Sequence, residues 1–178
     1  MPPRVRRATP DDAAACADLY RPYVLDTAIT FETEVPTVAE FAERIAKAIA
    51  THEFLVLEVD GCIAGYAYAQ TCNPRAAYRW SVETSVYVAQ DRRHTGGGRM
   101  LYTELLQRLA QRGFRRAFAG IAQPNEASNA LHAAFGFRPA GDYRRVGWKL
   151  GAWHDVTWWQ LDLLAPEDEV DPPRPIVS

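Results

Sequence analysis

Three consecutive glycines, Gly96-Gly97-Gly98, separate an apolar stretch typical of a buried strand from a leucine-striped stretch typical of a helix. The strand candidate is SVETSVYVA (residues 81–89), and the helix candidate is RMLYTELLQRLAQRG (residues 99–113). A glycine turn at a helix N-terminus leaves backbone N–H groups open to a ligand, and the helix dipole adds a positive partial charge there. The stretch therefore indicates a phosphate-binding loop, and a solvated surface turn is the alternative.

Two familiar phosphate-binding loops are excluded by the residues around the glycines. A Walker A loop needs Gly-Lys-Ser/Thr, and the stretch RRHTGGGRML holds no lysine. The dinucleotide fingerprint needs a third, spaced glycine within an N-terminal βαβ unit, whereas these glycines are contiguous and lie in the middle of the chain. If the loop binds phosphate, it does so in another kind of site.

Short strands and helices alternate along the first half of the chain. The stretch after the first strand predicts a helix that ends or kinks around Pro22, because the proline ring removes a backbone donor. Thr37 and Glu40 form a capping-box pattern that predicts the start of a second helix. Two strands follow, and Asp60-Gly61 predicts a tight turn between them because this pair tolerates positive φ.

The second half continues the alternation after the leucine-striped helix, which we expect to end at Gly113. A strand over 114–122 precedes a helix with Asn125 as its N-cap and Gly136 as its end. We expect the inward side of this helix to consist of Ala130, Leu131 and Ala134. The last two strands are expected at 142–151 and 154–164.

Composition narrows the domain count and the class of partner. The 178 residues suit one domain over 1–164, followed by an acidic, proline-rich tail over 165–178. A net charge of −2 and a pI near 6.1 argue against nucleic acid and anionic membranes as partners and favour a small molecule. Neither an apolar run of ~20 residues nor a signal-peptide pattern is found, so we expect a cytoplasmic protein. The three cysteines lack the spacing of a disulfide framework or a zinc site, and no metal is expected.

Arg93, Gly96 and Gly98 also match the pattern Arg/Gln-x-x-Gly-x-Gly/Ala. Together with the strand before it, the helix after it and NEASNALHAAFGF from Asn125 to Phe137, this pattern resembles the GNAT acetyltransferases. The resemblance implies an α/β (α+β) fold with a mixed, mostly antiparallel twisted sheet of about six to seven strands and about four helices. It also implies that the sheet is splayed between the two strands that hold acetyl-CoA.

The same resemblance implies which residues would bind acetyl-CoA. The pyrophosphate would lie on backbone amides of the glycine loop, the pantetheine arm would pair with the strand before it, and the arm would meet Asn125 further along. The implied binding residues are Val86, Tyr87, Val88, Arg93, His94, Thr95, Gly96, Gly97, Gly98, Arg99 and Asn125.

Several longer blocks are similar to one group within this superfamily. TAITFETEVPT, PRAAYRWSVETSVYV, QPNEASNALHAAFGF and GWKLGAWHDVTWWQLDL look like the phosphinothricin N-acetyltransferase group, which includes methionine sulfoximine acetyltransferases. The resemblance implies acetylation of the α-amine of a small amino acid analogue, and a homodimer. Acetylation of a peptide or protein amine, and a non-catalytic acetyl-CoA-binding module, are the alternatives.

Glu83 is the candidate general base. It lies in a strand otherwise filled by Val82, Val86 and Val88, where desolvation would raise the pKa of a carboxylate towards that of a working base. The alternative is an ion pair with an arginine such as Arg75, which would lower that pKa. The resemblance implies the catalytic role, directly or through water, and an oxyanion held by a backbone N–H near Val88.

His132 and Tyr102 are alternative donors of a proton to the leaving thiolate. Many GNAT enzymes have tyrosine at the position of His132, whereas the phosphinothricin group is similar to this chain in having histidine there. A histidine of near-neutral pKa could donate a proton or orient the substrate. The sequence leaves the choice between His132 and Tyr102 open.

Three residues are candidates for binding the acceptor. Arg75 offers a planar fork that suits an anion, and Tyr78 offers a hydroxyl. The resemblance to the group's matching stretch implies that Phe31 is a wall of the acceptor site.

Overall fold

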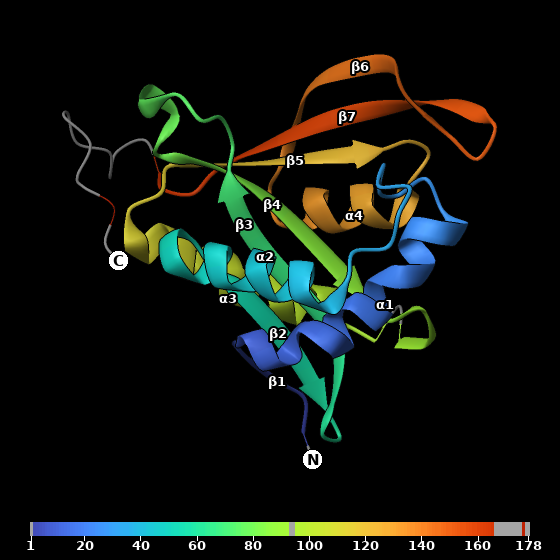
Figure 1. Cartoon of the computed structure of the whole chain (residues 1–178). Coiled ribbons are helices and arrows are strands. Elements are labelled where there is room, and N and C mark those ends of the chain that lie inside the picture. Colours follow the sequence, from blue (N-terminus) through green and yellow to red (C-terminus); the bar gives the residue numbers. More distant parts are fainter. Residues whose placement is uncertain (1, 93–94, 166–175, 177–178) are drawn as a thin grey trace.

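A computed structural model describes residues 2–92, 95–165 and 176. In this part of the chain seven strands form one sheet in the order β1-β2-β3-β4-β5-β7-β6 (Figure 1). Neighbouring strands are antiparallel, except that β4 and β5 are parallel. The strands are β1 (Arg4–Arg7), β2 (Phe54–Val59), β3 (Cys62–Thr71), β4 (Ser81–Val88), β5 (Arg116–Ala122), β6 (Arg138–Lys149) and β7 (Ala152–Asp162). The predicted mixed, mostly antiparallel sheet is confirmed.

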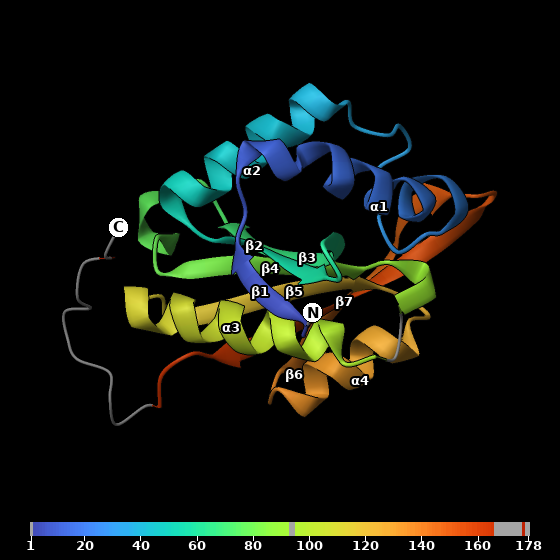
Figure 2. The same ribbon diagram turned by 90° about the horizontal axis from the view of Figure 1, so that it is seen from below.

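Four α-helices among the described residues cover the sheet from both sides. They are α1 (Ala13–Asp26), α2 (Val38–Thr51), α3 (Gly97–Arg112) and α4 (Glu126–Ala134). Short 3-10 turns add η1 (Pro10–Asp12), η2 (Ala76–Tyr78) and η3 (Gln90–Arg92). Figure 2 shows α1 and α2 on one face of the sheet and α3 and α4 on the other. No helix in the described ranges is long and apolar enough to cross a membrane.

Local sequence signals fix several element boundaries as predicted. Thr37 accepts a hydrogen bond from the Glu40 amide, and the Glu40 side chain accepts one from the Thr37 amide, which starts α2. Asp60 and Gly61 have φ of 51° and 80° in the turn between β2 and β3. Gly113 adopts φ 99° directly after α3, a backbone conformation that favours glycine.

The expected end of a helix at Pro22 and the expected inward face of α4 are wrong, and the alternative of a kink at Pro22 stays a prediction. Helix α1 continues through Pro22 to Asp26, because Tyr23 and Val24 beyond the proline are buried against the sheet and their packing holds the last turn. In α4 the buried residue is His132, whereas Ala130 and Ala134 are exposed and Leu131 is half-buried. The inward face of α4 is thus polar at its centre, which apolar periodicity does not predict.

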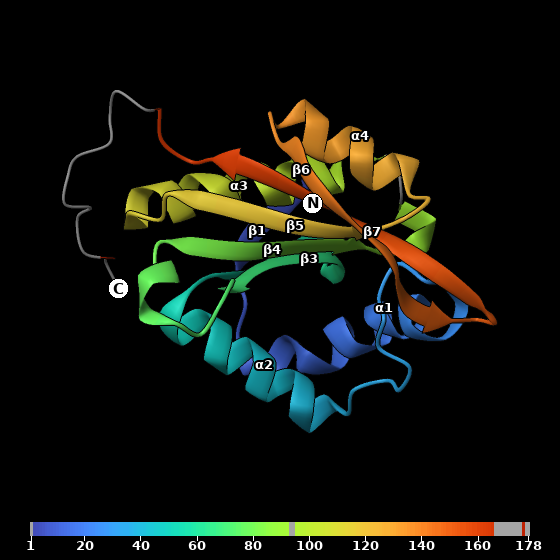
Figure 3. The same cartoon turned by 90° about the horizontal axis from the view of Figure 1, so that it is seen from above.

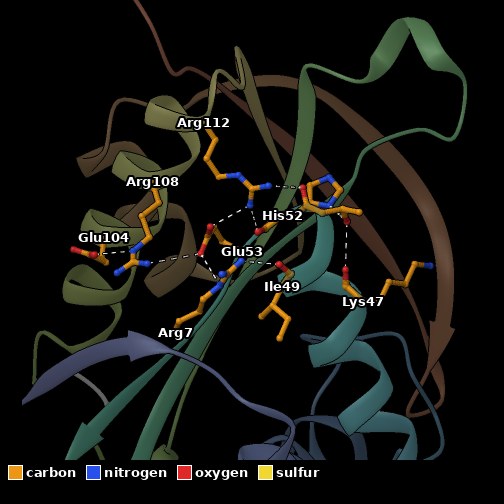
Figure 4. A network of polar contacts seen from close by, with 9 residues as sticks. Arg7, Lys47, Ile49, His52, Glu53, Glu104, Arg108 and Arg112 are labelled. Carbon is orange, nitrogen blue, oxygen red and sulfur yellow. Dashed lines mark hydrogen bonds and ion pairs between the residues drawn. The ribbon is translucent and has the colours of Figure 1, made fainter. Parts of the chain in front are cut away.

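A buried carboxylate links the ends of four elements, β1, β2, α2 and α3 (Figure 4). Glu53, directly before β2, is 7% exposed at its side chain and lies 3.1 Å from Arg112 of α3, with Arg7 of β1 and Arg108 within 4.0 Å. Arg112 also donates to the backbone carbonyl of His52, at the C-terminal end of α2. The cluster therefore joins these four elements through one buried side chain.

Strands β4 and β5 pair over only three residues. The pairs are Ser81 with Arg116, Val82 with Ala117 and Glu83 with Phe118. Beyond Glu83 no strand in the described part of the chain pairs with that edge of β4. The splay expected from the family resemblance is therefore present, and it begins at the candidate base.

Candidate active site

A pocket of about 360 Å³ lies where β4 diverges from β5. Its walls include Val86 and Val88 from β4 and Asn125 from the start of α4. Gly96, Gly97, Gly98 and Arg99 line it at the N-terminus of α3. The parallel pairing of β4 with β5 directs the glycine loop and the start of α4 towards the same end of the gap. Most of the predicted acetyl-CoA-binding residues thus border one cavity at a helix N-terminus.

A Cβ would have a different consequence at each of the three glycines. Gly96 adopts φ 86°, a conformation that side chains disfavour, and a Cβ there would meet no atom. A Cβ on Gly97 would lie 2.7 Å from Leu57 Cδ2, so this glycine lets α3 pack on the sheet. A Cβ on Gly98 would lie 3.5 Å from Leu131 Cδ2 and 3.8 Å from Val88 Cγ2, both of which line the pocket. Both distances are ordinary van der Waals contacts, so a methyl group at Gly98 would add to the pocket wall without a clash.

The remaining predicted binding residues differ in their surroundings. Thr95 donates its hydroxyl to the Arg92 carbonyl at 2.7 Å, which stabilises the turn before α3. Tyr87 packs edge-on to Tyr20 and Tyr23, with ring centroids 4.9 and 5.1 Å away. Arg93 and His94 lie outside the described residues.

A second, smaller pocket of about 40 Å³ adjoins the first. The two share Ile29, Val86, Asn125 and Ser128, so they meet along one wall. The smaller pocket also contains Tyr102 and His132, and Thr84 and Ser85 from the splayed part of β4. A ligand arm running along β4 from the glycine loop would reach these side chains at its far end.

Tyr102 and His132 form a buried hydrogen-bonded pair. The Tyr102 hydroxyl lies 2.9 Å from His132 Nε2, and His132 Nδ1 lies 2.7 Å from the Ser128 carbonyl oxygen. Because a carbonyl only accepts, Nδ1 carries a proton. Burial lowers the pKa of His132, which keeps the ring neutral at pH 7 and leaves Nε2 as an acceptor. The Tyr102 hydroxyl therefore donates to Nε2.

Tyr102 keeps its own proton at neutral pH. Its side chain is fully buried, and burial raises the pKa of its hydroxyl above the ordinary tyrosine value. Thr84 Oγ1 lies 3.3 Å from the hydroxyl and 3.3 Å from the Phe118 carbonyl, to which it donates. The hydroxyl is thus held between α4 and the diverging edge of β4.

Glu83 is half-buried at the point where β4 and β5 separate. Burial raises the pKa of its carboxyl, and a hydrogen bond from Gln70 on β3 partly offsets the rise. Within the described part of the chain it forms no ion pair with Arg75. The direction of the pKa shift is the one expected for a base rather than for a structural ion-pair partner.

The predicted acceptor residues lie at two ends of the sheet. Arg75 directly precedes η2 and Tyr78 is its last residue. Both lie in the connection from β3 to β4, and both are exposed. Phe31 lies in the connection from α1 to α2. Figures 1 and 3 show these two connections at opposite ends of the sheet. In a single chain, Arg75 and Tyr78 therefore lie on the Glu83 side, and Phe31 lies on the Val88 side.

Sequence reasoning missed three polar residues of the site. Ser128 fixes the tautomer of His132, and its position four residues earlier on α4 is a spacing that could have suggested the contact. Thr84 follows the candidate base directly in sequence. Gln70 is brought beside Glu83 by the β3–β4 register, which the sequence does not specify.

Comparisons with known proteins agree with this geometry. The family model of the acetyltransferase (GNAT) domain matches residues 5–158. A phosphinothricin N-acetyltransferase of Streptomyces viridochromogenes is 39% identical over 175 residues, which span 98% of this chain and 93% of that protein. An L-methionine sulfoximine/L-methionine sulfone acetyltransferase of Salmonella typhimurium is 34% identical over 160 residues, which span 89% and 94%.

A solved structure extends the agreement to the whole fold. A GNAT superfamily phosphinothricin acetyltransferase from Sinorhizobium meliloti, in complex with AcCoA, has a TM-score of 0.88 and 34% sequence identity, and the match covers 97% of each chain. The family model, the sequence relatives and the shared architecture lead to one conclusion. This chain belongs to the GNAT acetyltransferase family.

Proposed function

We propose that this protein uses acetyl-CoA to acetylate the α-amine of a small amino acid analogue of the phosphinothricin, methionine sulfoximine or methionine sulfone type. The observation that carries the proposal is the separation of β4 from β5 beyond Glu83. One continuous path there leads from the glycine loop to the Tyr102–His132 pair. Relatives bearing these substrate names match most of the chain.

The large pocket fits the donor substrate. Backbone N–H groups at the start of α3 suit the pyrophosphate, because they are unpaired within the helix and carry its positive dipole end. The edge of β4 at Val86, which pairs with no strand among the described residues, suits the amide groups of a pantetheine arm, whereas the Val88 carbonyl already accepts a hydrogen bond from the Tyr23 hydroxyl at 2.5 Å. Asn125 caps α4 by accepting from the Ser128 amide at 3.1 Å, which leaves its side-chain N–H₂ as a donor towards the pocket.

The acetyl transfer needs a base, an oxyanion donor and an acid. The amine nitrogen attacks the thioester carbonyl carbon, a C–N bond forms and the C–S bond breaks. Glu83 takes the proton that the amine loses, directly or through water, and its raised pKa suits that task. The thioester carbonyl must lie at the same end as Glu83 and Tyr102, so a backbone N–H of β4 in the Thr84–Ser85 stretch, rather than the expected one near Val88, stabilises the oxyanion.

Tyr102 supplies the proton to the leaving thiolate. His132 has no proton on the nitrogen that faces Tyr102, since its Nδ1–H is engaged by Ser128, so it accepts the single Tyr102 O–H in the resting site. The Tyr102 O–H rotates from His132 Nε2 towards the sulfur when it donates that proton. Tyr102 regains a proton and Glu83 releases one before the next turnover. The products are the N-acetylated acceptor and free CoA thiol.

Phe31 bounds the acceptor as a wall. Because Arg75 and Tyr78 lie at the opposite end of the sheet in the same chain, they anchor the anionic groups of this acceptor only when they come from the second copy of the homodimer proposed below. Ile29, two residues before Phe31, lines both pockets, which supports this placement of the wall. Arg75 offers a planar fork that matches carboxylate or phosphinate oxygens.

We further propose a homodimer in which a second copy covers the β6–β7 hairpin. Trp148 and Trp153 are 59% and 49% exposed, and their rings pack at 5.4 Å between centroids. Tyr143 and Leu150 on the same hairpin are 57% and 61% exposed. Such clustered apolar exposure marks an interaction surface. Sedimentation velocity of the wild type and of Trp148→Lys tests it, and a wild type that sediments as a monomer would overturn it.

The activity is tested by the release of free CoA thiol. Purified protein is mixed with acetyl-CoA and, in turn, phosphinothricin, methionine sulfoximine, methionine sulfone, the common amino acids and a set of short peptides. We expect turnover on one or more of the three analogues, and a rate about 100-fold lower with Glu83→Gln at the same protein concentration. Turnover on peptides alone, or tight acetyl-CoA binding without turnover on any acceptor, would overturn the proposed function.

A further inference from the structure

The connection between α1 and α2 packs against the β6–β7 hairpin. Figures 1 and 3 show the two segments side by side at one end of the sheet. The Phe31 ring lies on this contact, 6.3 Å between centroids from the ring of His154 on β7. Because Ile29 in the same connection lines the pocket of Tyr102 and His132, the contact lies beside the reaction site.

Gly147 on β6 provides the space that the Phe31 ring occupies. A Cβ at position 147 would lie 2.6 Å from Phe31 Cδ2 and from Cζ, and closer still to Cε2. Contacts this short involve three atoms of one rigid ring, so a side chain at 147 would displace the whole ring. The φ of Gly147 is not in the positive range, so an alanine would meet no backbone strain there. The three atoms that a Cβ at position 147 would approach most closely all belong to the Phe31 ring.

Lys149, two residues further along β6, fixes the backbone beside Phe31. Its Nζ donates to the Thr30 carbonyl at 2.7 Å, although the residue is only 6% exposed. On the other side, the Thr30 hydroxyl lies 2.5 Å from the Tyr20 hydroxyl of α1. Burial lowers the pKa of Lys149, and the nearby Glu32 carboxylate opposes that shift. Thr30 is thus hydrogen-bonded both to the β6–β7 hairpin, through Lys149, and to α1, through Tyr20.

We propose that Gly147 and Lys149 are positioning residues that set acceptor selectivity by fixing the place of the Phe31 ring. The proposal rests on the proposed function, in which Phe31 is the acceptor wall. Gly147 determines how closely the Phe31 ring can approach β6. Lys149 fixes the position of the Thr30 backbone, directly before Phe31. Selectivity between acceptors that differ by a few atoms is therefore controlled from the β6–β7 hairpin.

The test compares Gly147→Ala with Gly141→Ala on the same strand. A Cβ at Gly141 would meet no atom within 4 Å, and Gly141 has no positive φ, so this variant controls for any general effect of alanine in β6. With the best analogue acceptor, we expect Gly147→Ala to raise the acceptor KM about tenfold, in the range of one misplaced group in a pocket. We expect kcat within about twofold of wild type, and an unchanged KM for acetyl-CoA. Lys149→Met is expected to raise the acceptor KM in the same way.

A double-mutant cycle shows whether Gly147 acts through Phe31. In a Phe31→Ala background there is no ring to displace, so adding Gly147→Ala is expected to leave the acceptor KM unchanged. Sedimentation velocity of each variant excludes a change of assembly as the cause. The same cycle measured by urea unfolding reports the coupling of the two residues without any turnover.

The outcomes separate this inference from the function on which it rests. Equal acceptor KM values for Gly147→Ala and Gly141→Ala, or a Gly147→Ala effect that persists without the Phe31 ring, would overturn the inference while the wild type still turns over. A wild type that acetylates no amino acid analogue would overturn the proposed function, and with it the selectivity role of both residues.

Discussion

The hydroxyl of Tyr102 lies 2.9 Å from Nε2 of His132, and both side chains are almost wholly buried. The Ser128 carbonyl occupies the other ring nitrogen, so the proton between the two residues belongs to the tyrosine. The proton donor of this pair is therefore the Tyr102 phenol, and the His132 imidazole positions it.

Replacing Tyr102 by phenylalanine should lower kcat about 100-fold, the lower end of what a positioned acid contributes. His132→Gln, which replaces the imidazole acceptor by an amide oxygen on a more flexible side chain, should lower kcat roughly tenfold. Steady-state kinetics with saturating acetyl-CoA gives both values, and isothermal titration with CoA checks that donor binding is intact. The assignment is wrong if Tyr102→Phe keeps most of its kcat while His132→Gln loses it.

The pH profile of kcat/KM should have an acid limb that belongs to Glu83. Activity falls as pH decreases through the pKa of this group, because the protonated carboxyl accepts no proton from the amine. Burial places that limb above the ordinary carboxyl value of about 4.5. Gln70→Leu removes the hydrogen bond that lowers the pKa, so it should move the limb to higher pH. A limb that persists unchanged in the residual activity of Glu83→Gln would assign it to another group.

Alanine at Gly98 and at Gly96 should have separable effects. Gly98→Ala adds a methyl group to the wall of the donor pocket and should raise the KM for acetyl-CoA about tenfold, at nearly constant stability. Gly96→Ala forces a side chain into φ 86° and should lower the free energy of unfolding by about 1 kcal/mol. Urea unfolding and acetyl-CoA titration of both variants check the contrast. Equal effects of the two variants on both quantities would contradict it.

The cluster around Glu53 should contribute to stability and not to catalysis. Glu53→Gln leaves Arg112 without its buried counter-charge and should lower the free energy of unfolding by about 3 kcal/mol. Glu104→Gln is the matched control: Glu104 also pairs with Arg108, but at a more exposed site, so its effect should stay within about 0.5 kcal/mol (Figure 4). Urea unfolding measures both, and similar losses in the two variants would show that burial of the carboxylate is unimportant.

Features set by neighbours in sequence were predictable, and features set by distant packing were not. The capping box of Thr37 and Glu40 and the turn at Asp60-Gly61 are local chemistry, and both are present. Continuation of α1 past Pro22 depends on burial of the helix against the sheet, which outweighs the lost backbone donor. Local propensity alone carries no information about that packing.

The residues of the candidate site also divide into those that the local sequence predicts and those that depend on distant packing. Glu83 stands out because a carboxylate among valines is locally anomalous, and its raised pKa has the predicted direction. The burial of His132 depends on Tyr102, which lies 30 residues earlier in the chain. The role of Gly147 depends on a ring from the other end of the chain, so a single glycine in a strand pattern gave no sign of it.

The three-pair seam between β4 and β5 also affects how the molecule responds to its substrate. It divides the sheet into a four-stranded part and a three-stranded part that are joined mainly near Glu83. A ligand arm bonded along the rest of β4 would extend the hydrogen-bonded ladder across that boundary, as an added strand does. Bound acetyl-CoA would then connect the two parts of the sheet. The free energy of unfolding would therefore rise with the concentration of acetyl-CoA.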